Sequence, residues 1–487
     1  MSTEQLLLIE PLIGGLLCGF ISKNTLRRSL LILFSLGHFV LTLFCVVKGP
    51  DPHPGNLLGA DALSLLFLLI TSTLFLPVSI AMSRYLARQK TEEKPTSLFA
   101  SEAVFTAALL LFLFSMTLAI LSQHIGLFWM AVEATTLSSA PLICYHRSAQ
   151  TLEAAWKYLL ICSVGIAMAL IGNIALMVAT SFDPALTDTS LAFAHLIQHA
   201  HQLQPIWIKI AFVFFLIGYG TKMGLAPMHT WLPDAHSEAP SPVSALLSGA
   251  LLNCAFLGII RIQMLLRAAG LEHFSQELLL FFGISSMLIA GMFIIRQTGY
   301  KRMLAYSSVE HMGILAVALG CAGSFATFGG MFHALNHSLI KGSLFLTAGL
   351  ILHRYRTKNI DEVTGILQRS PITGVLWILG FLAICGVPPF SVFNSEMSIM
   401  TGLATQHHWI ILGLMLLALA LVFIGLAALM PRMAYGTPQA NTEKMPPEKP
   451  IDWIPPVLLC ATSLVLGIWM PAFLRNVIQM AADQIGS

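Results

Sequence analysis

The sequence FLIGYGTKMGLAPMHTWLPDAHSEAPSPVSALLSG, residues 215–249, decides how the fold is interpreted. It begins as an apolar run, carries a lysine at position 222, and then contains Pro227 and Pro233. Proline removes a backbone donor and clashes with the preceding turn. In a membrane, the backbone groups freed by such a break must be satisfied by protein or by water. The stretch therefore predicts a transmembrane helix that is broken beside a buried charge.

The rest of the chain has the composition of an integral membrane protein. Of its 487 residues, 56% are hydrophobic and 10% are charged, whereas soluble domains carry about 25% charged residues. The N-terminus lacks the basic region and cleavage site of a signal peptide, so we expect the first apolar run to remain as a helix. Long apolar runs predict an all-α fold of about fourteen spans near 4–21, 29–47, 61–83, 101–122, 125–145, 156–180, 206–226, 242–264, 276–295, 303–322, 326–352, 371–404, 409–431 and 452–473.

The positions of the basic residues orient these spans. Nineteen of the 26 Lys and Arg residues fall in the loops on one side, and five fall on the other. By the positive-inside rule, this asymmetry predicts a multi-pass protein of the cell's inner (plasma) membrane with both termini outside. The same asymmetry accounts for the formal charge of +3, so that charge does not indicate binding to nucleic acid.

Motifs for redox or nucleotide cofactors are not found in the sequence. The eight cysteines stand singly in apolar runs, without a CxxC pair, whereas iron–sulfur clusters and structural zinc use grouped thiolates. There is also no GxGxxG or Walker loop. We therefore expect no resident cofactor or metal.

A second span is also interrupted by proline. The segment GFLAICGVPPFSVFNSEMSIM (380–400) places Pro388 and Pro389 ahead of Glu396. Paired broken segments are the best sequence indication of a transport site. The two breaks lie five spans apart, and an odd number predicts two five-helix units of inverted topology. The expected organisation is 1–100 for helices 1–3, 101–264 for the first unit, 265–431 for the second, and 432–487 for a linker and helix 14.

Four charged residues lie within apolar surroundings: Glu133, Lys222, Lys341 and Glu396. A charge at the membrane centre costs roughly 2.5–3.5 kcal/mol, so four would cost on the order of 10 kcal/mol unless they face water or polar partners. Static ion pairs between helices would explain one such residue. Four of them, two at broken helices, favour a transport function. We expect Glu133 to pair with Lys222 and to stabilise its protonated form.

The segment FHALNHSLIKGSLF (332–345) places His333, His337 and Lys341 at i, i+4 and i+8. They lie on one helix face over about 12 Å. Imidazole titrates near neutrality, so the pattern favours a proton relay. A zinc site built on HxxxH is the competing hypothesis, and it would need the lysine as its third ligand.

Weaker candidates for the path lie in two further segments. Glu310 and His311, in MLAYSSVEHMGIL (303–315), either extend the path or satisfy their own helix. The polar, proline-rich stretch after the first break contains His229, Asp234, His236 and Glu238. This stretch could contribute to the path or could be a simple loop.

Four motifs resemble those of a known family: FWMAVEATTLSSAPL (128–142), GYGTKMGLAPMHTWLPDAHSEAPSPVSALLSG (218–249), KRMLAYSSVEHMG (301–313) and HALNHSLIKGSLF (333–345). They resemble the proton-translocating, antiporter-like membrane subunits of complex I and Mrp antiporters. VEATTLSSA is most similar to the hydrogenase-4 branch of this family. The resemblance extends from the third span to the thirteenth.

The resemblance implies fourteen core helices, inverted five-helix units, and broken seventh and twelfth helices. It also implies a hydrated mid-membrane axis formed by Glu133, Lys222, His333, His337, Lys341 and Glu396. One position departs from the family pattern. Many relatives carry a lysine or histidine in the eighth helix, where LLSGALLNCAFLG (246–258) has Asn253. Asparagine cannot take up a proton near neutral pH, so we expect water held by Asn253 and Ser248 to bridge this region.

The predicted function is proton translocation, with sodium as the alternative ion, by a subunit of a hydrogenase-4, formate hydrogenlyase or NADH:quinone oxidoreductase type complex. The expected partners are the other membrane and hydrophilic subunits of that complex and the lipid bilayer. The chain is expected to have no catalytic centre of its own. Two alternatives remain: a quinone-binding oxidoreductase subunit, and a stand-alone Mrp-like cation/proton antiporter or anion-uptake module.

Overall fold

A computed structural model describes residues 2–51, 57–89, 102–182, 191–437 and 447–486. These residues form an all-helical protein in which β-structure is limited to isolated bridges. The helices are α1 (Thr3–Phe20), α2 (Asn24–Lys48), α3 (Ala62–Arg88), α4 (Glu102–Leu121), α5 (Ile125–Ile143), α6 (Ala149–Ser181), α7 (Phe193–Gln198), α8 (Pro205–Met223), α9 (Trp231–Glu238), α10 (Ser241–Leu246), α11 (Leu252–Ala268), α12 (Glu272–Ile294), α13 (Tyr300–Cys321), α14 (Ser324–Tyr355), α15 (Ile366–Arg369), α16 (Pro371–Ile384), α17 (Ser391–Thr405), α18 (Trp409–Tyr435), α19 (Pro450–Ile468) and α20 (Ala472–Gly486).

Within the described residues, twelve helices are long and apolar enough to cross a membrane. Two of them are composite, because α8 continues through a 3-10 turn into α9, and α10 continues into α11. Two other predicted spans also correspond to helices in the structure, α5 and the pair α16–α17. The chain is therefore a multi-pass membrane protein, and the predicted spans match helices along its whole length.

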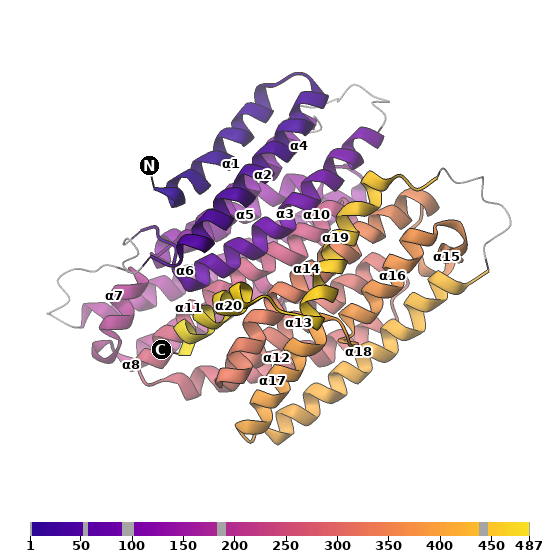
Figure 1. The fold of residues 1–487 in the computed structure, drawn as a ribbon. Coiled ribbons are helices and arrows are strands. Elements are labelled where there is room, and N and C mark those ends of the chain that lie inside the picture. Colours follow the sequence, from indigo (N-terminus) through magenta and orange to yellow (C-terminus); the bar gives the residue numbers. More distant parts are fainter. Residues whose placement is uncertain (1, 52–56, 90–101, 183–190, 438–446, 487) are drawn as a thin grey trace.

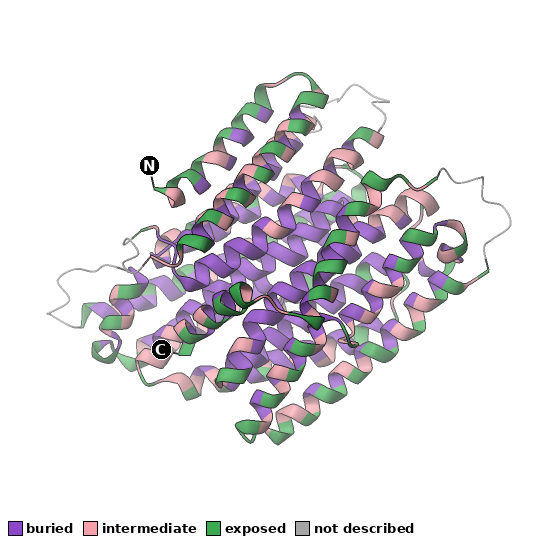
Figure 2. Ribbon diagram, viewed as in Figure 1, coloured by how far each residue is buried: buried purple, intermediate pink, exposed green. Residues whose placement is uncertain are grey.

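The helices of the middle of the chain form the interior of the bundle. The apolar stretches of α10–α11 and of α13 are buried throughout, whereas only about a third of those of α18 and α19 is buried, 28% and 33%. Figure 2 shows the buried central helices surrounded by helices with mixed or exposed faces. We call one end of the bundle the basic end, which is formed by the helix ends and loops that carry Lys23, Arg84, Arg147, Lys301 and Arg354.

The first predicted break is present, and its geometry corrects one detail of the prediction. Helix α8 ends at Met223, and Gly224 follows in the left-handed conformation with φ of 85°, which favours glycine. The freed backbone N–H of Ala226 donates to Ser286 Oγ at 2.9 Å, so a side chain satisfies it. Pro233 does not contribute to the break, because it lies near the start of α9. The segment that could have been a simple loop is therefore largely helical, since proline is tolerated in the first turn of a helix.

The second predicted break separates α16 from α17 and contains Pro388 and Pro389. The eighth span has an irregularity that the sequence did not predict. Between α10 and α11, residues Leu247–Leu251 form a π-helical segment, η4. Such segments occur often at functional sites, and this one contains Ser248 and ends just before Asn253.

At the far end of the bundle, opposite the basic end, hydrogen bonds join α3, α11 and the C-terminal helix α20. Asp61 is the N-cap of α3, and its carboxylate accepts a hydrogen bond from Ser64 N at 2.8 Å. The same carboxylate binds Arg261 of α11 at 2.8 Å and Gln484 of α20 at 2.9 Å. Helix α20 follows the fourteenth predicted span and packs against α3 and α14 (Figure 1).

Candidate functional site

Lys222 lies in the last turn of α8, directly before the first break, and is fully buried. Its Nζ donates to Thr136 Oγ1 on α5 at 2.8 Å and to Tyr158 Oη on α6 at 2.7 Å. The ammonium also lies 4.6 Å from the centroid of the Tyr158 ring. The break of α8 thus places a cation among hydroxyl groups and an aromatic face, both of which stabilise it away from bulk water.

Glu133 lies near Lys222, and the hydroxyl group of Thr136 bridges the two residues. Its Oε1 accepts from Ser163 Oγ at 2.9 Å, and its Oε2 accepts from Thr136 Oγ1 at 3.3 Å. Thr136 stands between the acid and the base because it lies one helical turn after Glu133 and faces Lys222. We call Glu133, Thr136, Tyr158, Ser163 and Lys222 the lysine cluster.

The middle of the bundle contains hydroxyl and amide groups that join α10–α11 to α13 and α14. Ser248 Oγ and Ser308 Oγ are 2.8 Å apart. Asn253 Nδ2 donates to Gly249 O at 3.0 Å and to Ser338 Oγ at 2.8 Å. The amide of Asn253 therefore binds the neighbouring helix α14, as a packing role requires, while its buried Oδ1 has no hydrogen-bond partner among the described residues.

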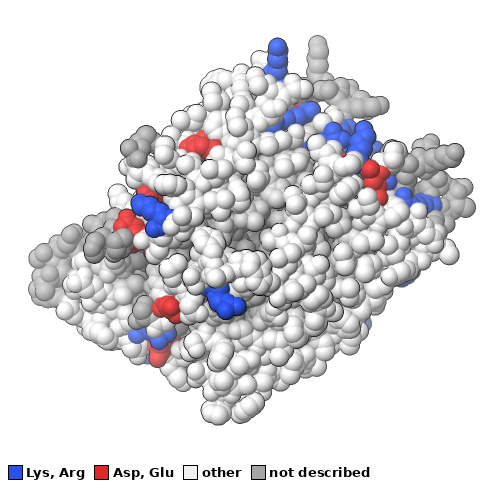
Figure 3. Space-filling model, viewed as in Figure 1, with Lys and Arg blue, Asp and Glu red and all other residues white. Residues whose placement is uncertain are grey.

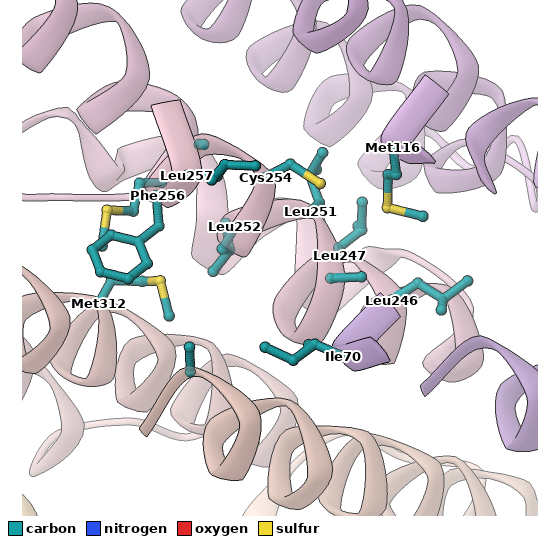
Figure 4. Close-up of a cluster of buried hydrophobic side chains, with 14 of the residues drawn as sticks. Ile70, Met116, Leu246, Leu247, Leu251, Leu252, Cys254, Phe256, Leu257 and Met312 are labelled. Atoms are coloured by element: carbon teal, nitrogen blue, oxygen red, sulfur yellow. The ribbon is translucent and has the colours of Figure 1, made fainter. Parts of the chain in front are cut away.

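These polar groups are surrounded by apolar side chains. Figure 4 shows Leu247, Leu251 and Leu252 of the eighth span packed beside Ile70 of α3 and Met116 of α4. All of these side chains are buried. The eighth span is therefore a largely apolar element with a few polar groups on its α13–α14 side.

Lys341 is fully buried on α14 and faces α13. Its Nζ donates to Leu304 O at 2.9 Å and also to Ser307 Oγ. Ser307 is the neighbour of Ser308, which contacts Ser248, so Lys341 is linked through α13 to the eighth span.

Beside the turns of α14 that precede Lys341, residues of three helices form a buried group that we call the histidine cluster. It contains Glu310 and His311 of α13, His333 and His337 of α14, and Glu396 of α17. His311 Nδ1 and His333 Nε2 are 2.9 Å apart, and the second nitrogen of His333 lies 3.0 Å from Ser395 Oγ on α17. The His337 ring centroid lies 5.3 Å from that of His311. Glu310 and His311, the weaker candidates of the sequence, thus belong to the same cluster as the stronger ones.

Glu396 reaches this cluster because the second break leaves room for it. Gly386 has φ of 61°, and a Cβ on this residue would collide with the Glu396 carboxylate. Glycine at this position is therefore required both by the backbone conformation and by the position of the acid.

Several polar atoms of the histidine cluster are buried without a hydrogen-bond partner among the described residues. They are both ring nitrogens of His337, Nε2 of His311, Oε2 of Glu310 and Oε1 of Glu396. His311 Nε2 does lie 3.5 Å from Glu310 Oε2, which is a longer contact. Because buried polar groups are nearly always paired in native proteins, this concentration makes the cluster a candidate functional site.

The histidine cluster also contains a set of residues that could hold a metal ion. Among the described residues, one ligand atom each from His311, His333 and Glu396 lies within 4.8 Å of the others. Two imidazoles and a carboxylate can bind Zn²⁺. However, the two ring nitrogens of His311 and His333 face each other in a hydrogen bond, which an ion would have to replace.

Of the four remaining candidates, two form ion pairs at the basic end. Asp234 binds Lys157 at 3.1 Å and Arg302 at 3.2 Å, and Glu238 binds Lys358 at 2.8 Å. The two histidines are buried, His229 beside Tyr306 and His236 stacked on Phe345. His236 has no hydrogen-bond partner for either ring nitrogen among the described residues.

A cavity of about 850 Å³ opens at the basic end next to this region. Its lining includes Glu238, Ala239, Lys301 and Lys358. Lys301, which the sequence indicated only as an orienting charge, is buried and donates to Ala239 O, just after α9. The burial of Lys301 could not be predicted from the sequence. A lysine in the first turn of a helix, directly after a polar loop, is normally expected to be exposed.

Sequence reasoning also missed the hydroxyl residues that connect the charged groups. Thr136 could have been identified, because it lies one turn after Glu133 on the same helix. Tyr158, Ser163 and Ser395 lie on other helices, and nothing in their local sequence indicates which charge they would contact.

Comparison with known proteins provides a match over most of the chain. Residues 122–423 match the family model described as NADH:quinone oxidoreductase/Mrp antiporter, TM. The chain is 38% identical to the "Hydrogenase-4 component F homolog" of Methylacidiphilum infernorum (isolate V4), over 82% of this chain and 83% of that protein. It is 29% identical to "Hydrogenase-4 component B" of Escherichia coli (strain K12), over 74% of this chain and 52% of that protein.

Solved structures share the fold. A chain of the membrane-bound sulfane sulfur reductase, an archaeal respiratory membrane complex, superposes with a TM-score of 0.88 at 23% identity, covering 100% of this chain and 98% of that one. A chain of the Mrp complex from Dietzia sp. DQ12-45-1b superposes with a TM-score of 0.85 at 20% identity, covering 100% and 98%.

Proposed function

Because the chain belongs to the NADH:quinone oxidoreductase/Mrp antiporter family, we propose that it moves protons across the membrane as one subunit of a larger redox complex. The match confirms the family that the sequence motifs predicted. The chain is an antiporter-like membrane subunit of the complex I and hydrogenase type. The similarity to hydrogenase-4 components favours a hydrogenase-type host complex.

The observation that carries this proposal is the set of buried, incompletely bonded titratable groups beside two broken helices. Lys222 lies at the first break, and Glu396 lies just after the second. Between them, Lys341 and three histidines line α13 and α14. Static ion pairs would satisfy such groups completely, whereas a proton path needs groups with an unused lone pair or proton.

We assign a role to each part of the path. The lysine cluster holds one proton on Lys222, and Glu133 stabilises the protonated form through Thr136. Lys341 and the histidine cluster form the second holding site, where His311 and His333 can exchange a proton over 2.9 Å. The largely apolar eighth span separates the two sites, so that in this proposal water beside Asn253 and Ser248 carries the proton between them.

The basic end is the side of proton uptake in this proposal. The positive-inside rule orients this end toward the cell interior, with both termini on the other side. The cavity lined by Lys301 and Glu238 opens at this end, and Glu238 lies on the same helix as the buried His236. Two C-terminal fusions check the orientation. An alkaline phosphatase fusion, which is active only outside the cell interior, should be active. An inactive phosphatase fusion together with a fluorescent fusion to a reporter that works only in the cytoplasm would reverse the assignment.

The proposed topology has fourteen crossings, twelve from the long apolar helices and two from α5 and α16–α17. Helices α4 to α11 and α12 to α18 then form two five-helix units of inverted topology, each with one broken helix. The breaks support this division because each one delivers a charged residue to the mid-membrane region.

The energy for transport must come from partner subunits. Moving one charge against 100 mV requires about 2.3 kcal/mol, and the sequence carries no grouped cysteines that would bind an iron–sulfur cluster. Partner chains would act on this subunit through the packing of its helices and through its charged axis.

The decisive experiment measures proton pumping by the intact complex in proteoliposomes during electron transfer. Lys222→Met should abolish acidification while the complex still assembles. Lys222→Arg should fail as well, because arginine stays protonated, and this variant keeps the buried charge. Lys209→Met is the matched control, because Lys209 lies on the same helix and contacts the Phe274 ring instead of the path. Acidification at the wild-type rate by both Lys222 variants would refute the proposal.

A further inference from the structure

An apolar groove runs along the outside of the bundle between α16 and α19. It has a volume of about 350 Å³, and its lining is almost wholly apolar, with Val375 and Leu379 on one side and Val457, Ala461 and Leu464 on the other. Ala461 is exposed, and Val375 is 48% exposed, so the groove is open laterally. A groove of this kind at membrane depth fits a hydrocarbon chain.

A basic pocket of about 200 Å³ lies at the basic end between α3, α14 and α19. Arg84, Arg88, Arg354 and Lys449 line it together with His353. Among the described residues, the acids in its lining are Asp452 and Glu448. In Figure 3, basic side chains gather at this end of the molecule, at the upper right of the view.

The two acids are already engaged by the protein. Asp452 forms ion pairs with Arg84, at 3.2 Å, and with Arg88. Glu448 accepts hydrogen bonds from the backbone N–H groups of Ile372 and Thr373, both at 3.0 Å, and thereby caps the first turn of α16. The four Arg and Lys side chains outnumber the two acids, so the pocket keeps a net positive charge suited to an anion.

The pocket and the groove adjoin each other. Thr373 lines the pocket, and its neighbour Ile372 lines the groove. On α19, Trp453 lines the pocket, and Val457, one turn further on, lines the groove. Tryptophan is enriched at the level of lipid headgroups. The arrangement therefore passes from cations through an aromatic ring to hydrocarbon, in the same order as the parts of a phospholipid.

We propose that the pocket and the groove together bind one anionic phospholipid, with its phosphate among the basic residues and an acyl chain between α16 and α19. Basic pockets between transmembrane helices on the cytoplasmic side bind anionic headgroups in other proteins. The proposal commits to an anionic lipid because of the charge of the pocket. It does not depend on the proposed proton path.

The test uses the full chain, purified in a nonionic detergent and stripped of lipid. Native mass spectrometry measures the binding of phosphatidylglycerol and of phosphatidylcholine with the same acyl chains. Phosphatidylglycerol should bind at least tenfold more tightly. Each basic residue near the surface contributes about 1 kcal/mol, or about fivefold in affinity. The Arg354→Gln, Lys449→Gln double variant should therefore weaken phosphatidylglycerol binding by about 25-fold. Phosphatidylcholine binding should weaken much less, because the choline cation offsets the charge of its phosphate.

A second pair of variants tests the groove. Ala461→Trp should fill it and weaken the binding of both lipids, whereas Thr462→Trp, one residue along α19 and outside the groove lining, should not. Lys23→Gln, an exposed basic residue on another helix of the same end, is the control for charge.

Three results would overturn the proposal. One is equal affinity for the two lipids. Another is full displacement of phosphatidylglycerol by millimolar inorganic phosphate, which would indicate an anion site without a lipid seat. The third is a cross-link from Ala461→Cys to a protein subunit in the intact complex, which would show that a partner helix fills the groove.

Discussion

Thr136 touches both charged residues of the lysine cluster, since it donates to Glu133 and accepts from Lys222. Thr136→Val keeps the shape of the side chain and removes this bridge. We expect proton pumping by the intact complex to fall about tenfold, the change that corresponds to about 1.4 kcal/mol in a barrier. Stability should fall by only about 0.6–2 kcal/mol, the range for a side-chain hydrogen bond in a membrane.

The neighbouring residue provides a matched control for this change. Thr135 is also buried on α5, but its hydroxyl donates to Val132 O within its own helix. Thr135→Val should leave pumping near the wild-type rate. Equal losses of pumping in the two variants would mean that Thr136 acts through packing of the helix.

Asn253 stands where the family resemblance led us to expect a titratable residue, and its amide group contacts Ser338 on α14. Two roles can be separated by replacing it with leucine. If water beside Asn253 carries the proton, Asn253→Leu should stop pumping while the chain keeps most of its stability. If the residue only joins two helices, the thermal stability should fall by about 0.6–2 kcal/mol and pumping should continue. We expect the first outcome, and both quantities should be measured on the same preparation.

At the scale of the helix, the first break depends on one glycine. Gly224 has a left-handed backbone, and a Cβ there would lie 2.5 Å from Leu232 Cδ1. Gly224→Ala should destabilise the solubilised chain by about 1–3 kcal/mol, as expected for strain at such a position. Gly413→Ala on α18, where nothing lies within 4 Å of the new methyl group, should instead be neutral or stabilising. Thermal unfolding of the two variants and of the wild type checks whether their changes in stability have opposite signs.

The helices show how far a sequence pattern can predict structure. Apolar length predicted the spans, and prolines beside charges predicted both breaks, because these are local properties of the chain. The pattern could not locate the first break, since the left-handed Gly224 ends α8 three residues ahead of Pro227. It also could not reveal η4 or α20, because a π-helical turn and a helix packed across the bundle depend on contacts with distant helices.

At the scale of the whole molecule, Asp61 fastens the start of α3 to α11 and to the C-terminal α20. Burial alone would raise the pKa of its carboxyl. The charge of Arg261 and hydrogen bonds from Arg261, Ser64 and Gln484 outweigh this effect and lower the pKa to about 2. A carboxyl with a lowered pKa stabilises the fold above its unfolded pKa of about 3.9, and this stabilisation is lost as the pH falls toward 2.

Asp61→Asn should therefore destabilise the chain near neutral pH by on the order of 2 kcal/mol, at about 1.36 kcal/mol per pKa unit. It should also flatten the dependence of the unfolding temperature on pH between about 5 and 2. Asp483→Asn is the control, because Asp483 is an exposed aspartate on α20. If Asp61→Asn loses stability on acidification as steeply as the wild type, another carboxyl is responsible.

The site as a whole was only partly predictable. The charged residues were identified because each is conspicuous in an apolar run, and the His333–His337–Lys341 spacing placed three of them on one face. The contacts between helices were not predictable. Glu133 and Lys222 were expected to pair, but their sequence positions could not show that Thr136 would lie between them. Glu310 and His311 gained their place in the histidine cluster only through the packing of α13 against α14.

The π-helical segment in the eighth span has a consequence for mutation by deletion. A π turn contains about one residue more than an α turn, and each residue of an α-helix turns by about 100°. Deleting one residue within Leu247–Leu251 would remove the extra residue, so the span could become regular α-helix while Asn253 keeps its position facing Ser338. Deleting one residue from the regular helix α11 would instead rotate one flank by about 100°. The chain should therefore tolerate a single-residue deletion within this segment better than in the α-helical turns on either side, and a library of single-codon deletions across residues 241–268 should show its highest residual function there.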